Sequence, residues 1–168
     1  MHVVIFEFWV SAARREEYLS LATALRPEVD KLDGFLGIER FENVAHPEHM
    51  ASISTWRDEA AIAEWRMFGP HRVAQGQGRA QIFDDYRLRV GEAIGAGGSV
   101  TVSEGLRLSG EGDLFASIVN PGKMLLLGGA AQSGEIARRF DVRIVRDYGM
   151  HAREQAPQVY PEVPRRSS

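Results

Sequence analysis

The chain has 168 residues, a formal net charge of −3 and no cysteine. Its length corresponds to about one domain with an ordinary hydrophobic core, and the lack of cysteine excludes disulfides, thiolate metal sites and cysteine nucleophiles. The two signs of charge are interspersed, which excludes a basic surface for nucleic acid or lipid, and no segment approaches the roughly 18 apolar residues of a membrane span. We therefore expect a cytoplasmic protein whose partner is a small molecule or a second copy of the chain.

The first half of the chain predicts an α+β fold. Its expected elements are a strand over 3–10, a helix over 11–32, strands over 35–44 and 50–56, a helical segment over 58–83 broken near Gly69 and Pro70, and a strand over 86–90. This order is that of a ferredoxin-like βαββαβ sandwich, with the helices on one face of a four-stranded sheet. The other face must also be covered, so a second sheet is required, from another chain or from the C-terminal half.

A fainter copy of the segment 41–57 returns at 115–129. Three matches share one constant offset: Phe41 with Phe115, Pro47 with Pro121, and Met50 with Met124. We interpret the second half as a truncated, β-rich partial repeat, with a strand over 100–108, a hairpin over 114–127, one or two helical turns over 135–139 and a closing strand over 140–145. A chance match of a few apolar positions is the alternative.

The predicted domain organisation follows from this repeat. Residues 1–95 form the first domain, the glycine-rich joint GAGG lies at 95–98, the partial repeat spans 98–156, and residues 157–168 form a flexible tail.

Aromatic and polar residues of the first half are predicted to line a small-molecule cavity. The apolar candidates are Phe6, Phe8, Trp56, Trp65, Met67 and Phe68, and the polar candidates are Glu7, Arg40, His71 and Gln75. A mostly apolar wall with a few donors and acceptors is typical of such a site. A carboxylate among apolar residues has its pKa raised, which would suit Glu7 as a general base. The alternatives are that Glu7 lies at a wet rim, that both tryptophans are core, and that His71 only starts its helix.

No established catalytic or metal-binding motif is present. The sequence has no Ser-His-Asp elbow, phosphate-binding loop or dinucleotide fingerprint. His46, Glu48 and His49 lie together in the turn between two predicted strands, but a metal site would need a third ligand and fixed tautomers. We predict a solvated turn and no metal.

Four segments together resemble the antibiotic biosynthesis monooxygenase (ABM) family of dimeric α+β barrels. They are EFWV, ALRPEVDKLDGF, STWRDEAAIAEW, and His71 followed by DYRLRV, and they cover Met1 to about Ile94. The most specific piece is TWRDEAAIAEW with His71 six residues after Trp65. The resemblance implies a homodimer whose two sheets close one barrel, with a pocket in each chain between the sheet and the helices. Some members oxidise aromatic polyketides with molecular oxygen and no metal or flavin, and others bind and degrade haem.

The haem-degrading branch is characterised by an Asn in the first strand, a Trp on the second helix and a His ten residues after that Trp. Trp65 matches the Trp, but Glu7 or a neighbour stands where the Asn would be, and the position ten residues after Trp65 is Gln75. We therefore expect neither haem nor another cofactor.

The resemblance and the residues together give a concrete hypothesis of cofactor-independent oxygenation of an aromatic or phenolic molecule. In it, His71 or Glu7 takes the phenolic proton, and Arg40 or Gln75 holds the developing oxyanion while oxygen acts as co-substrate. The alternative, from another class, is a non-catalytic small-molecule-binding or assembly protein.

Overall fold

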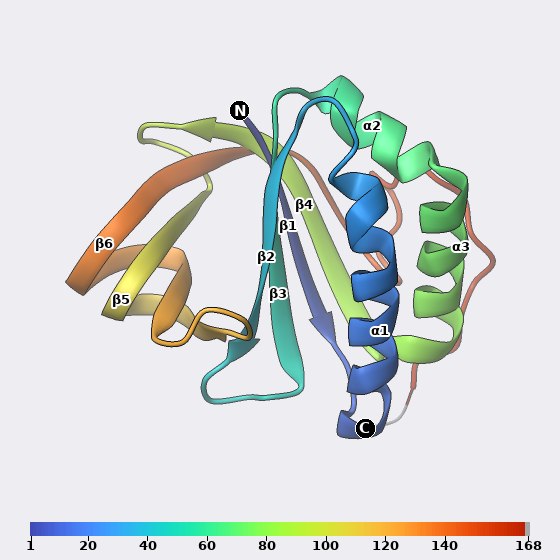
Figure 1. The fold of residues 1–168 in the computed structure, drawn as a ribbon, viewed down its shortest axis with the longest axis horizontal. Helices are drawn as coiled ribbons and strands as arrows, with labels where there is room; N and C mark the ends of the chain where they lie inside the picture. The colour runs from blue at the N-terminus through green and yellow to red at the C-terminus, as the bar shows by residue number, and fades with distance from the viewer. Residues whose placement is uncertain (167–168) are drawn as a thin grey trace.

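The computed structural model describes residues 1–166, and these form a closed β-barrel with helices packed on one side (Figure 1). In chain order the elements are β1 His2–Trp9, α1 Ala12–Val29, β2 Phe35–Asn43, β3 His49–Trp56, α2 Glu59–Met67, α3 Gly69–Gln77, the π-helical turn η1 Gly78–Ile82, β4 Asp85–Ile94, β5 Val100–Ser117 and β6 Lys123–Gly149. The barrel closes in the order β1-β3-β2-β5-β6-β4, as expected for the α+β class. Within the described residues, no helix is both long and apolar enough to cross a membrane.

The strand β1 lies at the centre of the first sheet, between β3 and β4, and both of its faces are covered. Val3 and Ile5 belong to the core inside the barrel, whereas Phe6 and Phe8 pack towards α1. Successive side chains of a strand point to opposite faces, so alternate residues of β1 serve two different cores. This is why the strand is apolar along nearly its whole length.

The opposite face of the first sheet is covered by β5 and β6, which form one long hairpin that bends back on itself. Along the hairpin, Val100 pairs with Val142 and Ala116 with Met124. The N-terminal part of β5 also pairs with the N-terminal part of β6, for instance Val102 with Leu127. The hairpin therefore supplies four strand segments side by side, and they join β2 at one edge and β4 at the other. The covering sheet comes from the same chain.

The barrel interior is filled by side chains of both halves. Its buried residues are Val3, Ile5, Phe41, Ala51, Ile53, Val100, Val102, Phe115, Leu125, Leu127, Phe140 and Val142. Phe41 and Phe115, which the sequence repeat matches, are both fully buried there. One core holds the two halves together, so the division into domains 1–95 and 98–156 stays a prediction. A homodimer also stays a prediction, and it would have to use a surface other than the covered sheet face.

The prediction of helical turns over 135–139 is wrong, because these residues belong to β6. Glu135 pairs with Leu106, Ile136 with Gly105 and Arg138 with Glu104. The approach is close: a Cβ added at Gly105 would lie 2.0 Å from the carbonyl oxygen of Glu135. A helix here would leave backbone groups of β5 unpaired in the barrel wall, and that cost outweighs the weak local helical pattern.

The C-terminal segment after β6, whose last part we expected to be a loose tail, runs along α3 (Figure 1). The Tyr160 hydroxyl donates to Gln75 Oε1 at 2.8 Å, and Arg166 donates to the carbonyl oxygen of Gln81 at 3.0 Å. Residues 167 and 168 of the predicted tail lie outside the described residues. The segment thus belongs to the surroundings of the helices.

If one core joins both halves, truncating a residue of the second half must destabilise the first. We expect Phe115→Ala to lower the free energy of unfolding by about 3–5 kcal/mol. All three tryptophans, Trp9, Trp56 and Trp65, lie in the first half. Urea unfolding followed by tryptophan fluorescence and by far-UV circular dichroism should therefore give one shifted midpoint.

The matched control is Val119→Ala, because Val119 is 67% exposed in the same half of the chain. It should change the free energy of unfolding by less than about 0.5 kcal/mol. A fluorescence midpoint that Phe115→Ala leaves unchanged would contradict the shared core.

Candidate functional site

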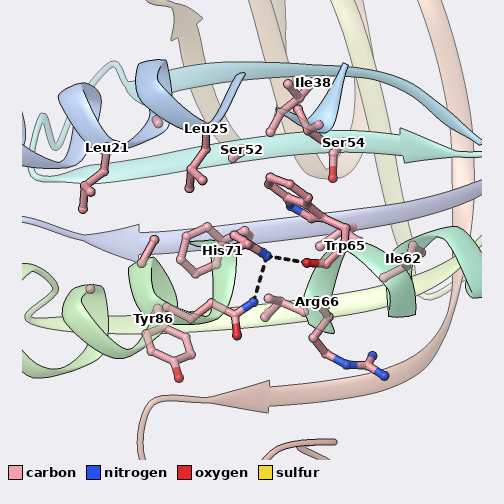
Figure 2. A pocket seen from close by; sticks show the side chains of 18 of the residues that line it. Leu21, Leu25, Ile38, Ser52, Ser54, Ile62, Trp65, Arg66, His71 and Tyr86 are labelled. Carbon is pink, nitrogen blue, oxygen red and sulfur yellow. Dashed lines mark hydrogen bonds between the residues drawn. The ribbon is translucent and has the colours of Figure 1, made fainter. Parts of the chain in front are cut away.

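A cavity of about 240 Å³ lies between the helix-facing side of the first sheet and the helices α1, α2 and α3 (Figure 2). Figure 2 shows Leu21 and Leu25 of α1 pointing across the space towards the strands, with Trp65 of α2 beside it. The residues after β4 complete the wall with Tyr148, Arg153, Gln158 and Tyr160. The wall is largely apolar with a few convergent polar groups, as in small-molecule sites.

The helix break between α2 and α3 places His71 in this wall. Phe68 adopts an extended conformation with ψ of 124°, and Pro70 sits in the first turn of α3, where its missing N–H costs nothing. The chain turns there, and the His71 ring stacks on Trp65 with ring centroids 4.3 Å apart. The break therefore brings together two residues that lie six positions apart in the sequence.

His71 makes two polar contacts through its Nδ1 atom. Its Nδ1 lies 2.9 Å from the backbone carbonyl oxygen of Trp65, which can only accept (Figure 2). We infer that Nδ1 carries the hydrogen and that Nε2 keeps its lone pair. The amide nitrogen of Gln75 lies 3.0 Å from the same Nδ1. Burial lowers the pKa of His71 from 6.5 to about 4, only partly opposed by the hydrogen bond to Trp65. His71 is therefore a neutral proton acceptor at neutral pH.

Arg40 and Tyr18 form the second polar group of the cavity wall. Arg40 Nε donates to the Tyr18 hydroxyl oxygen at 2.9 Å, joining β2 to α1. Burial raises the pKa of Tyr18 even though the charge of Arg40 opposes the shift, so the phenol stays neutral. The pair presents hydrogen-bond donors to the cavity.

Six of the ten predicted cavity residues line the cavity: Phe6, Arg40, Trp56, Trp65, His71 and Gln75. Two aromatic candidates do not. Phe8 is fully buried and packs on Tyr18 and Phe83, whereas Phe68 stacks on Trp65 with centroids 5.5 Å apart. Met67, a further apolar candidate, is 54% exposed to solvent. These residues support or flank the cavity without lining it.

Glu7 does not share the cavity with His71, because it lies on the other face of β1. Its carboxylate accepts hydrogen bonds inside the barrel from His49 Nε2, at 3.1 Å, and from Arg89. Burial alone would raise the pKa of Glu7, but the bond from His49 and the charge of Arg89 lower it below its ordinary value. Glu7 is therefore an ionised structural carboxylate, and the prediction of a base with a raised pKa is wrong.

Of the two histidines predicted to lie in a solvated turn, only His46 does so, because His49 begins β3 and is buried. His49 is buried and bonds Glu7, with its ring stacked on Trp9 at a centroid distance of 4.4 Å. His46 stays exposed, with Nδ1 3.7 Å from a carboxylate oxygen of Glu48. The side chains of His46 and His49 therefore do not converge on one point, as the ligands of a metal ion would.

Sequence analysis missed several wall residues: Tyr18, Ser52, Ser54, Tyr86, Tyr148, Arg153, Gln158 and Tyr160. For Tyr86 the signal existed, since it alternates with Leu88 and Val90 on the apolar side of β4. No local signal marked Arg153 or Tyr160, because they follow the last strand in a segment without periodicity. Their positions depend on contacts with α3 and β4.

The fold and the site define a class of protein: an α+β barrel that holds a small-molecule cavity between one sheet and its helices. The family model described as "Antibiotic biosynthesis monooxygenase" matches residues 1–77, from β1 to the end of α3. This part of the chain is therefore similar to the antibiotic biosynthesis monooxygenase family. The matched part includes Trp65, His71 and Gln75.

One relative and one solved structure match most of the chain, and a second solved structure matches about half of it. Jasmonate monooxygenase ABM of Pyricularia oryzae is 29% identical over 212 aligned positions, covering 96% of this chain and 99% of the relative. A protein of Lactobacillus acidophilus NCFM, provisionally assigned as a monooxygenase, covers 87% of this chain and 93% of its own at 13% identity and a TM-score of 0.50. A conserved protein of Methanosarcina mazei Go1 covers 53% and 88% at 16% identity and a TM-score of 0.50. The two structures share the fold.

The lowered pKa of His71 predicts a pH-dependent contribution to stability. The unfolded chain binds a proton at His71 below pH 6.5, whereas the folded chain does so only near pH 4. Between these values protonation favours the unfolded state, so stability falls as the pH falls, by up to about 3 kcal/mol from this group.

Wild type and His71→Gln should therefore differ in the pH dependence of their unfolding free energies, measured in urea at intervals from pH 7 to pH 4. We expect wild type to lose about 3 kcal/mol more than the variant over this range. Parallel curves for the two proteins would show that His71 is not buried in its neutral form.

Proposed function

We propose that this protein is a monooxygenase that uses molecular oxygen, without metal or flavin, to oxidise an apolar small molecule with an aromatic or other cyclic body. The observation that carries the proposal is a part-buried, neutral histidine, His71, in the wall of an apolar cavity. The match of residues 1–77 to the family model and a full-length relative named for monooxygenation of jasmonate support it.

The proposed reaction begins with transfer of a proton from the substrate to His71 Nε2. The electron-rich anion then reduces oxygen, a CH₂ group becomes a carbonyl, and the second oxygen atom leaves as water. The substrate supplies all four electrons, so R₂CH₂ and O₂ give R₂C=O and H₂O with no external reductant. Gln75 lies next to His71, and its side-chain amide is a donor for the oxyanion that precedes the transfer.

The pKa of about 4 makes His71 a weak base in the empty cavity. A bound anion changes this, because an opposite charge within about 4–6 Å favours the protonated imidazole and raises its pKa. The proton transfer is thus driven by the ion pair that it creates between the imidazolium and the substrate anion. Such a pair is strong because the apolar wall excludes water.

The low pKa of His71 also favours a second candidate, a protein that binds the same kind of molecule without oxidising it. In that case His71 and Gln75 only orient the ligand by hydrogen bonds. The two candidates differ in oxygen uptake.

The test is oxygen uptake in the presence of a panel of anthrones and alkyl-substituted phenols, in buffer with a metal chelator. We expect consumption of oxygen and, with ¹⁸O₂, one labelled atom in the product. His71→Gln should lower kcat about 100-fold or more, the usual contribution of a general base. His46→Gln is the matched control, since His46 lies exposed in a distant turn and its replacement should leave kcat unchanged.

Binding of these compounds without uptake of oxygen would contradict the oxygenase and leave the binding protein. Activity that a chelator abolishes, and that added metal restores, would contradict the cofactor-independent reaction.

A further inference from the structure

The charged groups of the cavity wall are all of one sign. The wall contains four arginines, Arg26, Arg40, Arg66 and Arg153, and none of its residues is Asp or Glu. His71 adds no charge at neutral pH, because its pKa is about 4. A cavity that must hold only a neutral apolar molecule has no need of this arrangement.

Most of this positive charge has no carboxylate partner within residues 1–166. Arg26 is the exception, since its Nε lies 2.8 Å from Asp30 Oδ1. Arg153 donates only to neutral oxygens: the Tyr86 hydroxyl at 3.0 Å and the carbonyls of Gly149 and Gln158. Behind the wall, Arg79 is 5% exposed, and it too bonds neutral acceptors, among them the Tyr86 hydroxyl.

Uncompensated cations beside an apolar space favour an anion that enters it. Removing a charge from water is costly unless an opposite charge or strong hydrogen bonds replace the lost hydration. A guanidinium presents paired N–H donors in a geometry that matches a carboxylate, and the match is frequently bidentate. The ligand that completes this wall therefore carries a carboxylate on an otherwise apolar body.

Arg40 is the arginine best prepared to receive that carboxylate. Its Nε is held by the Tyr18 hydroxyl, while no described residue accepts a hydrogen bond from its two Nη groups. The Nη groups of Arg153 are already engaged. Figure 2 shows the Arg66 guanidinium pointing away from His71 and Trp65. Ser52, which faces Arg40 across the β2–β3 ladder and also lines the cavity, offers a hydroxyl donor beside it.

We propose that the cavity selects an amphipathic carboxylate, whose apolar body lies among the aliphatic and aromatic wall residues and whose carboxylate is bound by Arg40. Tyr18 is a positioning residue, because it holds the guanidinium in place through Nε. The inference rests on the proposed function only in taking the same cavity as the substrate site.

The test compares two ligands that differ only in the head group. Binding of octanoate and of octanol is measured by titration calorimetry at neutral pH. Wild type should bind octanoate at least about tenfold more tightly than octanol, the effect expected of a charge-assisted contact. Arg40→Gln should abolish this preference and leave octanol binding unchanged.

The matched control is Arg15→Gln. Arg15 also joins α1 to β2, through an ion pair with Glu42, but it does not line the cavity. The variant should keep the wild-type preference, and a thermal melt of each variant confirms folding.

Equal binding of the two ligands to wild type, or no binding of either, would overturn the proposal without the use of any variant. An unchanged preference in folded Arg40→Gln would overturn the role of Arg40. Carboxylate preference without oxygen uptake on any carboxylate or phenol contradicts the oxygenase and leaves this inference standing. Oxygen uptake on neutral phenols with no carboxylate preference contradicts this inference and leaves the oxygenase standing.

Discussion

Both faces of the central sheet must be covered, and the rest of the structure depends on this constraint. The helices α1, α2 and α3 cover one face of the first sheet and leave the cavity between the two layers. The hairpin of β5 and β6 covers the other face and contributes side chains to the core inside the barrel. Because strand residues alternate between faces, successive side chains of β1 point either towards the helices or into the barrel. The sheet therefore separates the chemistry of the cavity from the packing that stabilises it.

The register of the hairpin against the first sheet is the one that two copies of one unit would make. Phe41 pairs with Ser117 and Asn43 with Phe115, so exchanging each residue for its counterpart in the repeat leaves the ladder unchanged. The four strand segments of the hairpin also follow the spatial order of the four strands in the first sheet. In both, the segment that comes last in the chain lies next to the first, and the third lies between the first and the second. The connections that lead to the second and to the fourth segment differ. They are helices in the first half and the extended bends of β5 and β6 in the second half.

Local patterns in the sequence were enough to predict the elements of the first half of the chain and the need for a second sheet. Asp58 caps α2, with Oδ1 accepting from the Ala61 amide at 2.9 Å. Patterns failed where a long-range partner decides the conformation. Residues 135–139 resemble a helical turn, yet their backbone completes the ladder of β5. Tyr160 lies in the cavity wall with its hydroxyl bonded to Gln75 of α3, a partner 85 residues away in the chain.

Glu7 shows why the site was harder to predict than the fold. In a strand that is apolar on both sides, composition does not tell which face a given residue occupies, and only its pairing partners do. The register of β1 against β3 sends Glu7 towards His49 and Arg89 and sends Phe6 towards the cavity. A slip of one residue would exchange these faces and place a carboxylate in the cavity. The register of one central strand thus keeps the cavity free of acidic groups, so the same backbone pairing that closes the barrel also sets the charge that an incoming ligand meets.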